Sequence, residues 1–541
     1  MTKQKILIFS LLIIILLIAG FFRLYKLNSI PPGLYPDVAI NGNDVLDSLK
    51  TNDFKIFYPE NNGREGLFFW FIALSFLIFG ANVFAIKIVA AIFGILTVLG
   101  TYLLTKELFK IGHWSLGFGV FKNEVIALLA SFFLSISFWH VNFSRIGFRA
   151  ILVPFALVYG FYFLYKGFNS KKFYNFLLSG FFFAFGFYTY ISYRFMVFIL
   201  AISLFCWLLV YKKENNQKRF FKFAFCVLLF TFIFALPIGV YFALHPQDFF
   251  GRAAGVSVLS QPNPVFVFLK SLVVHFGMFN FYGDANWRHN FSTSPHLIWP
   301  VGIFFLIGLI LSITKFIKSI KNKDNSGLAV YGLLLSWFFF MLFPSALSYE
   351  GIPHALRTIG VIPVAYIFAG LGAYWVFEKI NIFYKTKTAK IIFNVIVVLF
   401  LTSLLFAEFN KYFIKWAGNP NVKDAFSTDL ADIGNYLNSL PDNIDKFVVV
   451  NLSGVGVPYP DGIPMPAQTP IFIERAKYGK TRAVYIKTED LENIKIKNNT
   501  IIIPLSYNQE LMGKIINLFP NGVLEKEKGI WSYKLNFYPV K

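Results

Sequence analysis

An aspartate shortly after the first apolar run is the residue of this chain best suited to acid–base chemistry. The segment Ile30-Pro-Pro-Gly-Leu-Tyr-Pro-Asp37 follows apolar residues 6–22, and its prolines end a helix that would continue from that run. We expect Asp37 close to the membrane surface, where a carboxylate can serve as a general base for a substrate held at the interface. The alternative is that Asp37 is the N-cap of the next helix. Asp44 and Asp47 are expected on a solvated face.

Five further segments combine arginine with acidic, tyrosine or histidine side chains. A guanidinium can hold a phosphate or a carboxylate at two points, which lysine cannot do. We therefore predict an anion site, and the alternative is that these arginines pair with acidic residues or reach for the membrane interface. The candidate residues are Arg64 and Glu65; Arg145 and Arg149; Tyr190 and Arg194; Asp284, Arg288 and His289; and Glu350, His354 and Arg357.

The spacing of Arg145 and Arg149 predicts that they share one face if the segment is helical, where like charges repel unless an anion lies between them. Four of the seven histidines, among them His140 and His296, lie in the candidate segments. Their spacing matches no metal-ligand motif, so no cofactor is predicted and a divalent metal stays an open alternative. We find no glycine-rich phosphate loop, which argues against a nucleotide-driven pump or a nucleotide-sugar donor.

The composition places these residues in a membrane protein. Of 541 residues, 56% are hydrophobic, 20% aromatic and only 14% charged. A soluble domain has roughly 25% charged residues, so a soluble enzyme is excluded, as is a disordered or fibrous chain. The net charge of +22 indicates cytoplasmic anchoring and not nucleic-acid binding. The two cysteines, Cys206 and Cys226, lie in apolar stretches and make no disulfide framework.

Eleven apolar runs are candidates for membrane-spanning helices, and we interpret the first as a retained helix and not as a cleaved signal peptide. A further short run, 67–79, is predicted to be an interfacial or re-entrant helix. The spans lie near residues 6–22, 84–105, 124–139, 149–165, 173–189, 195–211, 220–243, 297–314, 327–347, 358–378 and 391–407.

The distribution of basic residues decides the topology. With 67–79 uncounted, the loops on the side of the N-terminus hold 21 Lys and Arg in 61 residues, and the opposite loops hold 12 in 122. The positive-inside rule then predicts a multi-pass plasma-membrane protein with a cytoplasmic N-terminus. Eight of the 12 outer basic residues are Arg, against one of the 21 inner ones. The long outer loops are 22–65 and 244–296, and the second also contains Arg252.

The predicted fold is an all-α polytopic membrane domain, residues 1–407, followed by a different kind of domain at 408–541. The latter alternates β-branched runs near 446–451, 483–487 and 500–504 with helical stretches 429–440 and 509–518. This pattern is typical of a small α/β domain. Eleven spans from a cytoplasmic start place it outside the cytoplasm.

The chain resembles the bacterial membrane glycosyltransferases of the GT-C superfamily, family 39, related to protein O-mannosyltransferases and lipid A aminoarabinose transferases. The resemblance covers most of residues 30–365. It is carried by PPGLYPDVAINGNDVL, by NGREGLFFWFIALSFLIFGANVFAIKIVAAIFGILTVLGTYLLTKELF, and by SFWHVNFSRIGFRAIL, GFYTYISYRF, YGDANWRHN and YEGIPHALRTIGVIP. The apolar W-x-x-A-x-S-x-x-x-F-G helix is its most specific part.

This resemblance implies a polyprenyl-phosphate-linked sugar donor and inverting transfer to an acceptor hydroxyl on the outer face of the membrane. The catalytic Asp of the family corresponds to Asp37, and the basic residue that contacts lipid phosphate corresponds to Arg64. Relatives commonly have Asp-Glu where this chain has Asp37-Val38. The sugar and the acceptor, whether protein, lipid or glycan, stay open.

Two other classes of function remain as alternatives. A transporter or flippase of an anionic lipid or glycan would need ionisable residues deep in the spans and inverted repeats. The spans are almost free of charge, which counts against it. A non-catalytic receptor or assembly factor that presents 408–541 would leave the arginine-rich loops without a role.

Overall fold

The computed structural model describes residues 3–110 and 120–536, and their contacts form two compact units. The first unit consists of residues 1–27 and 90–418, and the second of 28–89 and 419–541. Most of the predicted first outer loop, residues 28–65, therefore belongs to the same unit as residues 419–541. The side chain of Arg252 lies outside the described residues.

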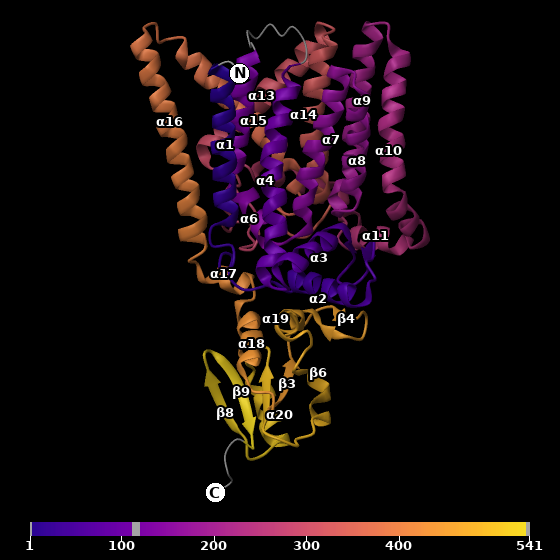
Figure 1. Cartoon of the computed structure of the whole chain (residues 1–541), viewed down its shortest axis with the longest axis vertical. Helices are drawn as coiled ribbons and strands as arrows, with labels where there is room; N and C mark the ends of the chain where they lie inside the picture. Colours follow the sequence, from indigo (N-terminus) through magenta and orange to yellow (C-terminus); the bar gives the residue numbers. More distant parts are fainter. Residues whose placement is uncertain (1–2, 111–119, 537–541) are drawn as a thin grey trace. The chain divides into compact units, whose positions relative to one another are not determined.

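The first unit is a bundle of long apolar helices (Figure 1). Each of the eleven apolar runs predicted from the sequence contains a helix. The helices are α1 (Lys3–Leu24), α4 (Val83–Leu108), α5 (Val120–Ile136), α6 (Phe138–Ile146), α7 (Leu152–Ser170), α8 (Phe173–Phe187), α9 (Met196–Lys213), α10 (Gln217–Leu244), α11 (Pro246–Gly255), α12 (Pro264–Gly277), α13 (Trp299–Lys321), α14 (Asn325–Ala346), α15 (Ile362–Asn381) and α16 (Lys387–Phe409).

The lengths of these helices confirm a multi-span protein. In the described ranges nine helices are long and apolar enough to cross a membrane, and α5 with α6 forms a tenth candidate bent by 55°. Helix α8 has 15 residues, fewer than the roughly 17–25 that a span needs. The predicted span 173–189 is therefore present as a helix that is shorter than a typical span.

Glycines allow α13 and α15 to pack backbone against backbone. A Cβ on Gly308 would lie 1.8 Å from the carbonyl oxygen of Phe368, and one on Gly372 would lie 1.9 Å from that of Phe304. Small residues at such crossings are the usual way for membrane helices to gain packing where lipid removes the hydrophobic driving force.

The first part of the second unit comes from the first outer loop. It contains α2 (Pro36–Thr51), the short antiparallel pair β1 (Phe57–Tyr58) and β2 (Arg64–Glu65), and α3 (Leu67–Phe79). Helix α3 coincides with the run predicted to be interfacial or re-entrant. Its side chains Leu74, Leu77 and Ile78 are 55%, 74% and 65% exposed, which suits contact with lipid. Its placement in a membrane stays a prediction.

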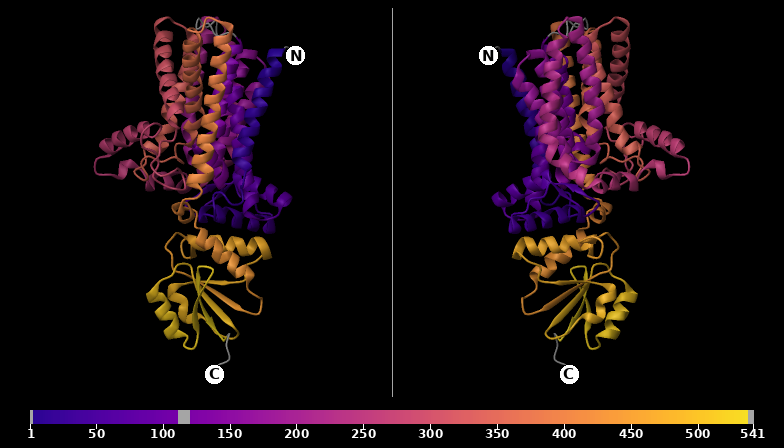
Figure 2. Two further views of the ribbon diagram at one scale, coloured as in Figure 1. Left: turned by 90° about the vertical axis from the view of Figure 1, so that its left-hand side faces the viewer. Right: turned by 90° about the vertical axis from the view of Figure 1, so that its right-hand side faces the viewer.

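The rest of the second unit is the predicted α/β domain, and the structure confirms it. Its sheet has the order β6-β3-β7-β9-β8, in which the first three strands are parallel and the last two pair antiparallel (Figure 2). The strands are β3 (Asp445–Val450), β6 (Val484–Lys487), β7 (Thr500–Pro504), β8 (Val523–Glu527) and β9 (Ile530–Leu535), beside the small pair β4 (Gly456–Val457) and β5 (Ile463–Pro464).

Helices cover both faces of this sheet. Helix α18 (Thr428–Ser439) contributes Leu430, Ile433 and Leu437 to the core on one face, and α20 (Gln509–Leu518) contributes Leu511 and Ile515 to the core on the other. The buried strands β3 and β7 accordingly read as almost continuous apolar runs. The remaining helices of the unit are α17 (Pro420–Ala425) and α19 (Gln468–Tyr478).

The centre of the sheet should be the most sensitive part of this domain. Ile502 is fully buried in β7, so Ile502→Ala should lower the free energy of unfolding by about 2–4 kcal/mol through lost burial and a residual cavity. Val484 on the edge strand β6 is 54% exposed, and Val484→Ala serves as the control with a loss of about 0.5 kcal/mol. Limited proteolysis of the purified full chain at increasing temperature measures the difference. Equal sensitivity of the two variants would contradict this packing.

Candidate active site

Asp37 lies in the first turn of α2 and is not its N-cap. The N-cap is Tyr35, which makes no side-chain capping bond, and Pro36 is the first helical residue. Asp37 is half-buried and accepts a hydrogen bond of 2.9 Å from the Asn61 side-chain amide. A carboxylate in the first turn is stabilised by the helix dipole. The N-cap alternative is therefore removed, and Asp37 keeps an accessible carboxylate.

The turn that contains Asn61 consists of residue types that suit its backbone angles. Asn61, Asn62 and Gly63 all have positive φ angles of 54°, 63° and 83°, a region that Asn and Gly tolerate best. At Gly63 a Cβ would also lie 2.5 Å from the Phe57 ring. This tight turn connects β1 to β2 and holds the Asn61 amide against Asp37.

Arg64, directly after the turn, is almost fully buried and bound within its own unit. Its guanidinium forms an ion pair with Asp44 at 2.7 Å and donates to the Asn41 side chain at 3.0 Å. Its Nε donates to the carbonyl oxygen of Glu60 at 3.0 Å. Asp44 is thus not on a solvated face as expected, because it is the partner of Arg64.

The other acidic residues near this segment also have defined positions. Asp47 is mostly exposed, as expected, and pairs with Arg475 of α19. Glu65 is buried in β2, and in the antiparallel pairing of β1 with β2 it lies opposite Phe57.

Arg145 and Arg149 do not share a helix face. Helix α6 ends at Ile146, because Gly147 takes a φ of 92°, and Arg149 begins a separate 3-10 turn, Arg149–Ile151. Arg145 donates to the carbonyl oxygens of Phe22 at 2.9 Å and Tyr25 at 2.7 Å. These carbonyls are at the end of α1, where helix geometry leaves them without partners.

The remaining predicted arginines of the bundle lie in different surroundings. Arg149 lies over the ring of Tyr190, with the guanidinium carbon 5.3 Å from the ring centre. Arg194 donates to the carbonyl oxygen of Phe249 at 2.6 Å. Arg288 is half-buried, and its backbone N–H donates to the Asn286 side chain.

Arg357 forms an ion pair with Glu350 at 3.1 Å and donates to the Ser348 hydroxyl at 2.5 Å. Glu350 is about half exposed, so this pair faces water on one side. A phosphate could compete for such a pair more easily than for a buried one.

Asp284 is the centre of a buried polar cluster that joins two loops of the bundle. Its Oδ2 accepts hydrogen bonds from His289 Nδ1 at 3.0 Å and from the backbone N–H of Ala355 at 2.8 Å. His354 Nδ1 lies 4.0 Å from the same oxygen. The other carboxylate oxygen of Asp284, Oδ1, accepts a hydrogen bond from the backbone N–H of Asn286.

The charges of this cluster follow from its burial. Burial opposes ionisation of Asp284, but the hydrogen bonds from His289 and from the backbone of Ala355 help to outweigh it, and the pKa of the carboxyl is held well below its usual range. Burial lowers the pKa of His289 and holds the pKa of His354 well below the ordinary histidine value. At neutral pH the cluster therefore contains one carboxylate and neutral imidazoles.

Two further histidines belong to this cluster. His275 of α12 accepts from the backbone N–H of His354 at 3.3 Å, and its Nε2 is 2.6 Å from the Ser345 hydroxyl. The backbone N–H of Asp284 is 3.5 Å from His296 Nε2. His275 could not be joined to the site from its sequence position, because it lies inside an apolar run.

The sequence reasoning also missed a buried charged group at the end of the last span. Glu408 is fully enclosed and accepts from the backbone N–H of Phe138 at 3.2 Å, at the start of α6. Lys411 donates to the carbonyl oxygen of Pro295 at 3.4 Å. A glutamate that directly follows an apolar span was the available signal for an inward-facing residue.

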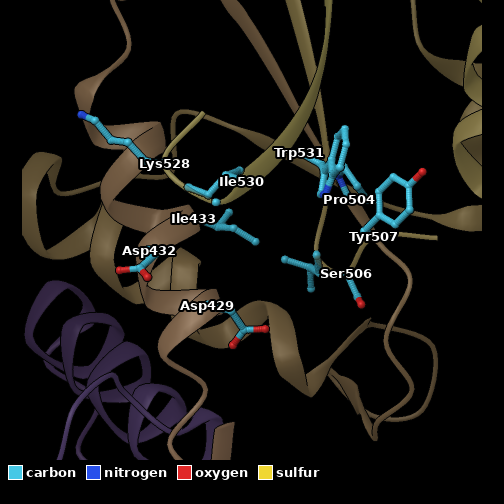
Figure 3. A pocket seen from close by; sticks show the side chains of 11 residues that line it. Asp429, Asp432, Ile433, Pro504, Ser506, Tyr507, Lys528, Ile530 and Trp531 are labelled. Carbon is cyan, nitrogen blue, oxygen red and sulfur yellow. The ribbon is translucent and has the colours of Figure 1, made fainter. Parts of the chain in front are cut away.

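The C-terminal domain has a pocket of about 320 Å³ where β7 ends. Figure 3 shows Asp429 and Asp432 on one side of it and the rings of Tyr507 and Trp531 on the other. The carboxyl ends of parallel strands are common ligand sites in α/β sheets. Its lining combines two carboxylates with a lysine and two aromatic rings, which are groups that can bind a ligand.

Comparisons with known proteins identify the fold. Residues 66–241 match the model of the family described as dolichyl-phosphate-mannose-protein mannosyltransferase. The structure is similar to ArnT from Cupriavidus metallidurans bound to undecaprenyl phosphate, with a TM-score of 0.50, 10% identity and 98% of each chain covered. The chain has an ArnT-like fold. The apo state of that ArnT gives a TM-score of 0.53 over the same share of both chains.

A second similar structure has a larger chain. It is the oligosaccharyltransferase AglB from Archaeoglobus fulgidus in complex with an inhibitory peptide and a dolichol-phosphate, with a TM-score of 0.54 and 15% identity. The match covers 83% of the present chain and 63% of AglB. No curated protein matches the sequence.

The buried pair of Arg64 and Asp44 should stabilise the first loop of this ArnT-like fold. Arg64→Met leaves Asp44 without its partner and should lower the free energy of unfolding by about 3 kcal/mol. The double variant with Asp44→Asn should recover part of that loss, because no uncompensated carboxylate remains. Thermal unfolding of the purified protein in detergent measures both variants. A single variant as stable as the wild type would show that the pair contributes nothing.

Proposed function

We propose that this protein is an inverting glycosyltransferase that moves a sugar from a polyprenyl-phosphate donor to an acceptor hydroxyl on the outer face of the membrane. The observation that carries the proposal is the half-buried carboxylate of Asp37, held by Asn61 in a chain with an ArnT-like fold. The ArnT structure contains undecaprenyl phosphate and the AglB structure a dolichol-phosphate, which supports a lipid-phosphate donor.

In this proposal Asp37 removes the proton of the acceptor hydroxyl. The oxygen attacks the anomeric carbon from the face opposite the phosphate, so the carbon–oxygen bond to phosphate breaks as the new glycosidic bond forms. The leaving phosphate gains negative charge in the transition state, and fixed positive charge stabilises it. Because a clamped phosphate is a good leaving group, no strong general acid is required.

The contacts within the bundle suggest which arginines bind the donor phosphate. Arg145 uses its donors on the carbonyl oxygens that end α1, which makes it a structural residue. Arg288 and Arg357 are the better candidates, because Arg288 is half-buried in the loop of Asp284 and the acidic partner of Arg357 is a half-exposed glutamate. We propose that these two contact the phosphate.

Asp37→Asn should abolish transfer while leaving expression and stability unchanged. The asparagine keeps the shape of the side chain but cannot accept the proton, so we expect a loss of about 10²–10⁴-fold in turnover. Asp47→Asn in the same helix is the matched control, since Asp47 is exposed and pairs with Arg475. The assay uses purified protein, short-chain polyprenyl-phosphate sugars and a panel of acceptors. Wild-type turnover by Asp37→Asn would remove Asp37 from the mechanism.

Arg288→Ala and Arg357→Ala should weaken donor binding. Loss of one charge-assisted hydrogen bond to phosphate corresponds to about 1.5–3 kcal/mol, or roughly 10- to 100-fold in Kd. The control is Arg219→Ala, because Arg219 lies in the first turn of α10, at an end of the bundle predicted to be cytoplasmic. Titration of a fluorescent polyprenyl phosphate measures the affinity. If both variants bind the lipid as the wild type does, these arginines do not form the phosphate site.

A further inference from the structure

We propose that Asp284, His289 and His354 bind a divalent transition metal, with Zn²⁺ as the ion that fits them best. One donor atom from each residue lies within 4.8 Å of the other two. Asp284 Oδ2 is 3.0 Å from His289 Nδ1 and 4.0 Å from His354 Nδ1. Neighbouring ligands of a tetrahedral Zn²⁺ lie about 3.3 Å apart, so rotation of the side chains would bring the three donor atoms to ligand spacing.

A hydrogen bond to Asp284 does not explain why His354 Nδ1 faces that carboxylate. A separation of 4.0 Å from Asp284 Oδ2 is too long for a hydrogen bond. His354 Nδ1 accepts a weak bond of 3.4 Å from the backbone N–H of Arg357, so this nitrogen carries a lone pair and not a proton. Two electron-rich atoms therefore face each other inside the protein. A cation between them turns this unfavourable approach into two bonds.

His289 can supply its Nδ1 to the same ion. In the metal-free protein the proton on this nitrogen is donated to Asp284. A metal needs the lone pair of Nδ1, so the neutral imidazole binds it as the other tautomer, with its single proton moved to Nε2. The rings of His289 and His354 are 4.8 Å apart between centroids, so both can turn toward one point without a change of backbone.

The groups behind the three ligands hold them in place. The backbone N–H groups of Ala355 and Asn286 fix the Asp284 carboxylate, one on each oxygen. His275 Nδ1 is 2.7 Å from the carbonyl oxygen of Ser271, so it is the donor there and Nε2 is the acceptor for the backbone N–H of His354. Such outer partners orient the ligands of metal sites.

The nearby positive charge does not prevent binding. Arg357 is paired with Glu350 and also donates to Ser348. Two imidazoles and one carboxylate are a common donor set for Zn²⁺, and three protein ligands leave a position for water or for an anionic oxygen. The His354 side chain is 16% exposed, which gives that position access from outside.

The test measures metal directly. The full-length protein is purified in detergent with a tag free of histidine, stripped with a chelator, and dialysed against Zn²⁺ or Co²⁺. We expect one Zn²⁺ per chain by elemental analysis. The Co²⁺ form should show the visible absorption of four-coordinate cobalt with nitrogen and oxygen ligands. Both readouts are taken without donor or acceptor, so their result is independent of the proposed transferase activity.

Variants assign the ligands. His354→Gln and His289→Ala should each lose the bound metal, and the rise of melting temperature that Zn²⁺ gives the wild type should disappear. His354→Gln is the decisive variant, because it leaves both backbone bonds to Asp284 in place. His245→Gln is the control and should bind as the wild type does, since His245 contacts the carbonyl oxygen of Tyr241. A folded wild type that binds no more metal than His354→Gln would overturn the proposal.

Discussion

The loops of the helix bundle depend on one buried carboxylate, that of Asp284. It binds one backbone N–H of its own loop and one of the distant loop that contains Ala355, and it also accepts from His289. A buried carboxylate needs hydrogen-bond donors on both of its oxygens, since an unpaired charge would cost several kcal/mol. The need to satisfy it fixes the two loops against each other.

The arginines of the bundle show the same constraint with the opposite sign. Arg23 is completely buried near the end of α1 and donates to the carbonyl oxygens of Ala19 and Ser135. Its Nη2 is also 2.7 Å from His140 Nδ1. Arg145 serves the next carbonyls of the same helix end. The planar guanidinium that can bind phosphate can also bind several carbonyl oxygens at the end of a helix. An excess of arginine is therefore explained first by such structural hydrogen bonds and only then by a bound ligand.

Sequence patterns predicted the elements of this protein better than the partners of its charges. Apolar runs and the alternating pattern near 446–451 report local structure, which hydropathy and periodicity determine. The pair of Arg64 and Asp44 is different, because it forms only after a tight turn brings β2 back to α2. Likewise, the spacing of Arg145 and Arg149 assumed a continuous helix, and Gly147 ends it between them. Partners across a chain reversal depend on tertiary structure that no spacing encodes.

The contacts of residues 36–65 give the C-terminal domain a structural part in the candidate active site. Helix α2, which begins beside Asp37, packs on α19, where Asn43 donates to Gln468 and Arg475 pairs with Asp47. The turn residue Glu60 accepts from the backbone N–H of Tyr459. The proposed base and the amide that holds it thus belong to the same compact unit as residues 419–541.

In this arrangement the C-terminal domain, in which we recognise no catalytic motif, helps to order helix α2. Helix α2 is only 16 residues long. It contains the run Asn41-Gly42-Asn43-Asp44, whose residues all have low helix propensity. Gly42 in turn allows close packing, because a Cβ there would lie 2.4 Å from the Phe472 ring of α19. A helix of low intrinsic stability must gain its order from tertiary packing. Helix α19 supplies part of that packing, and the orientation of the Asp37 carboxylate therefore depends on the C-terminal domain.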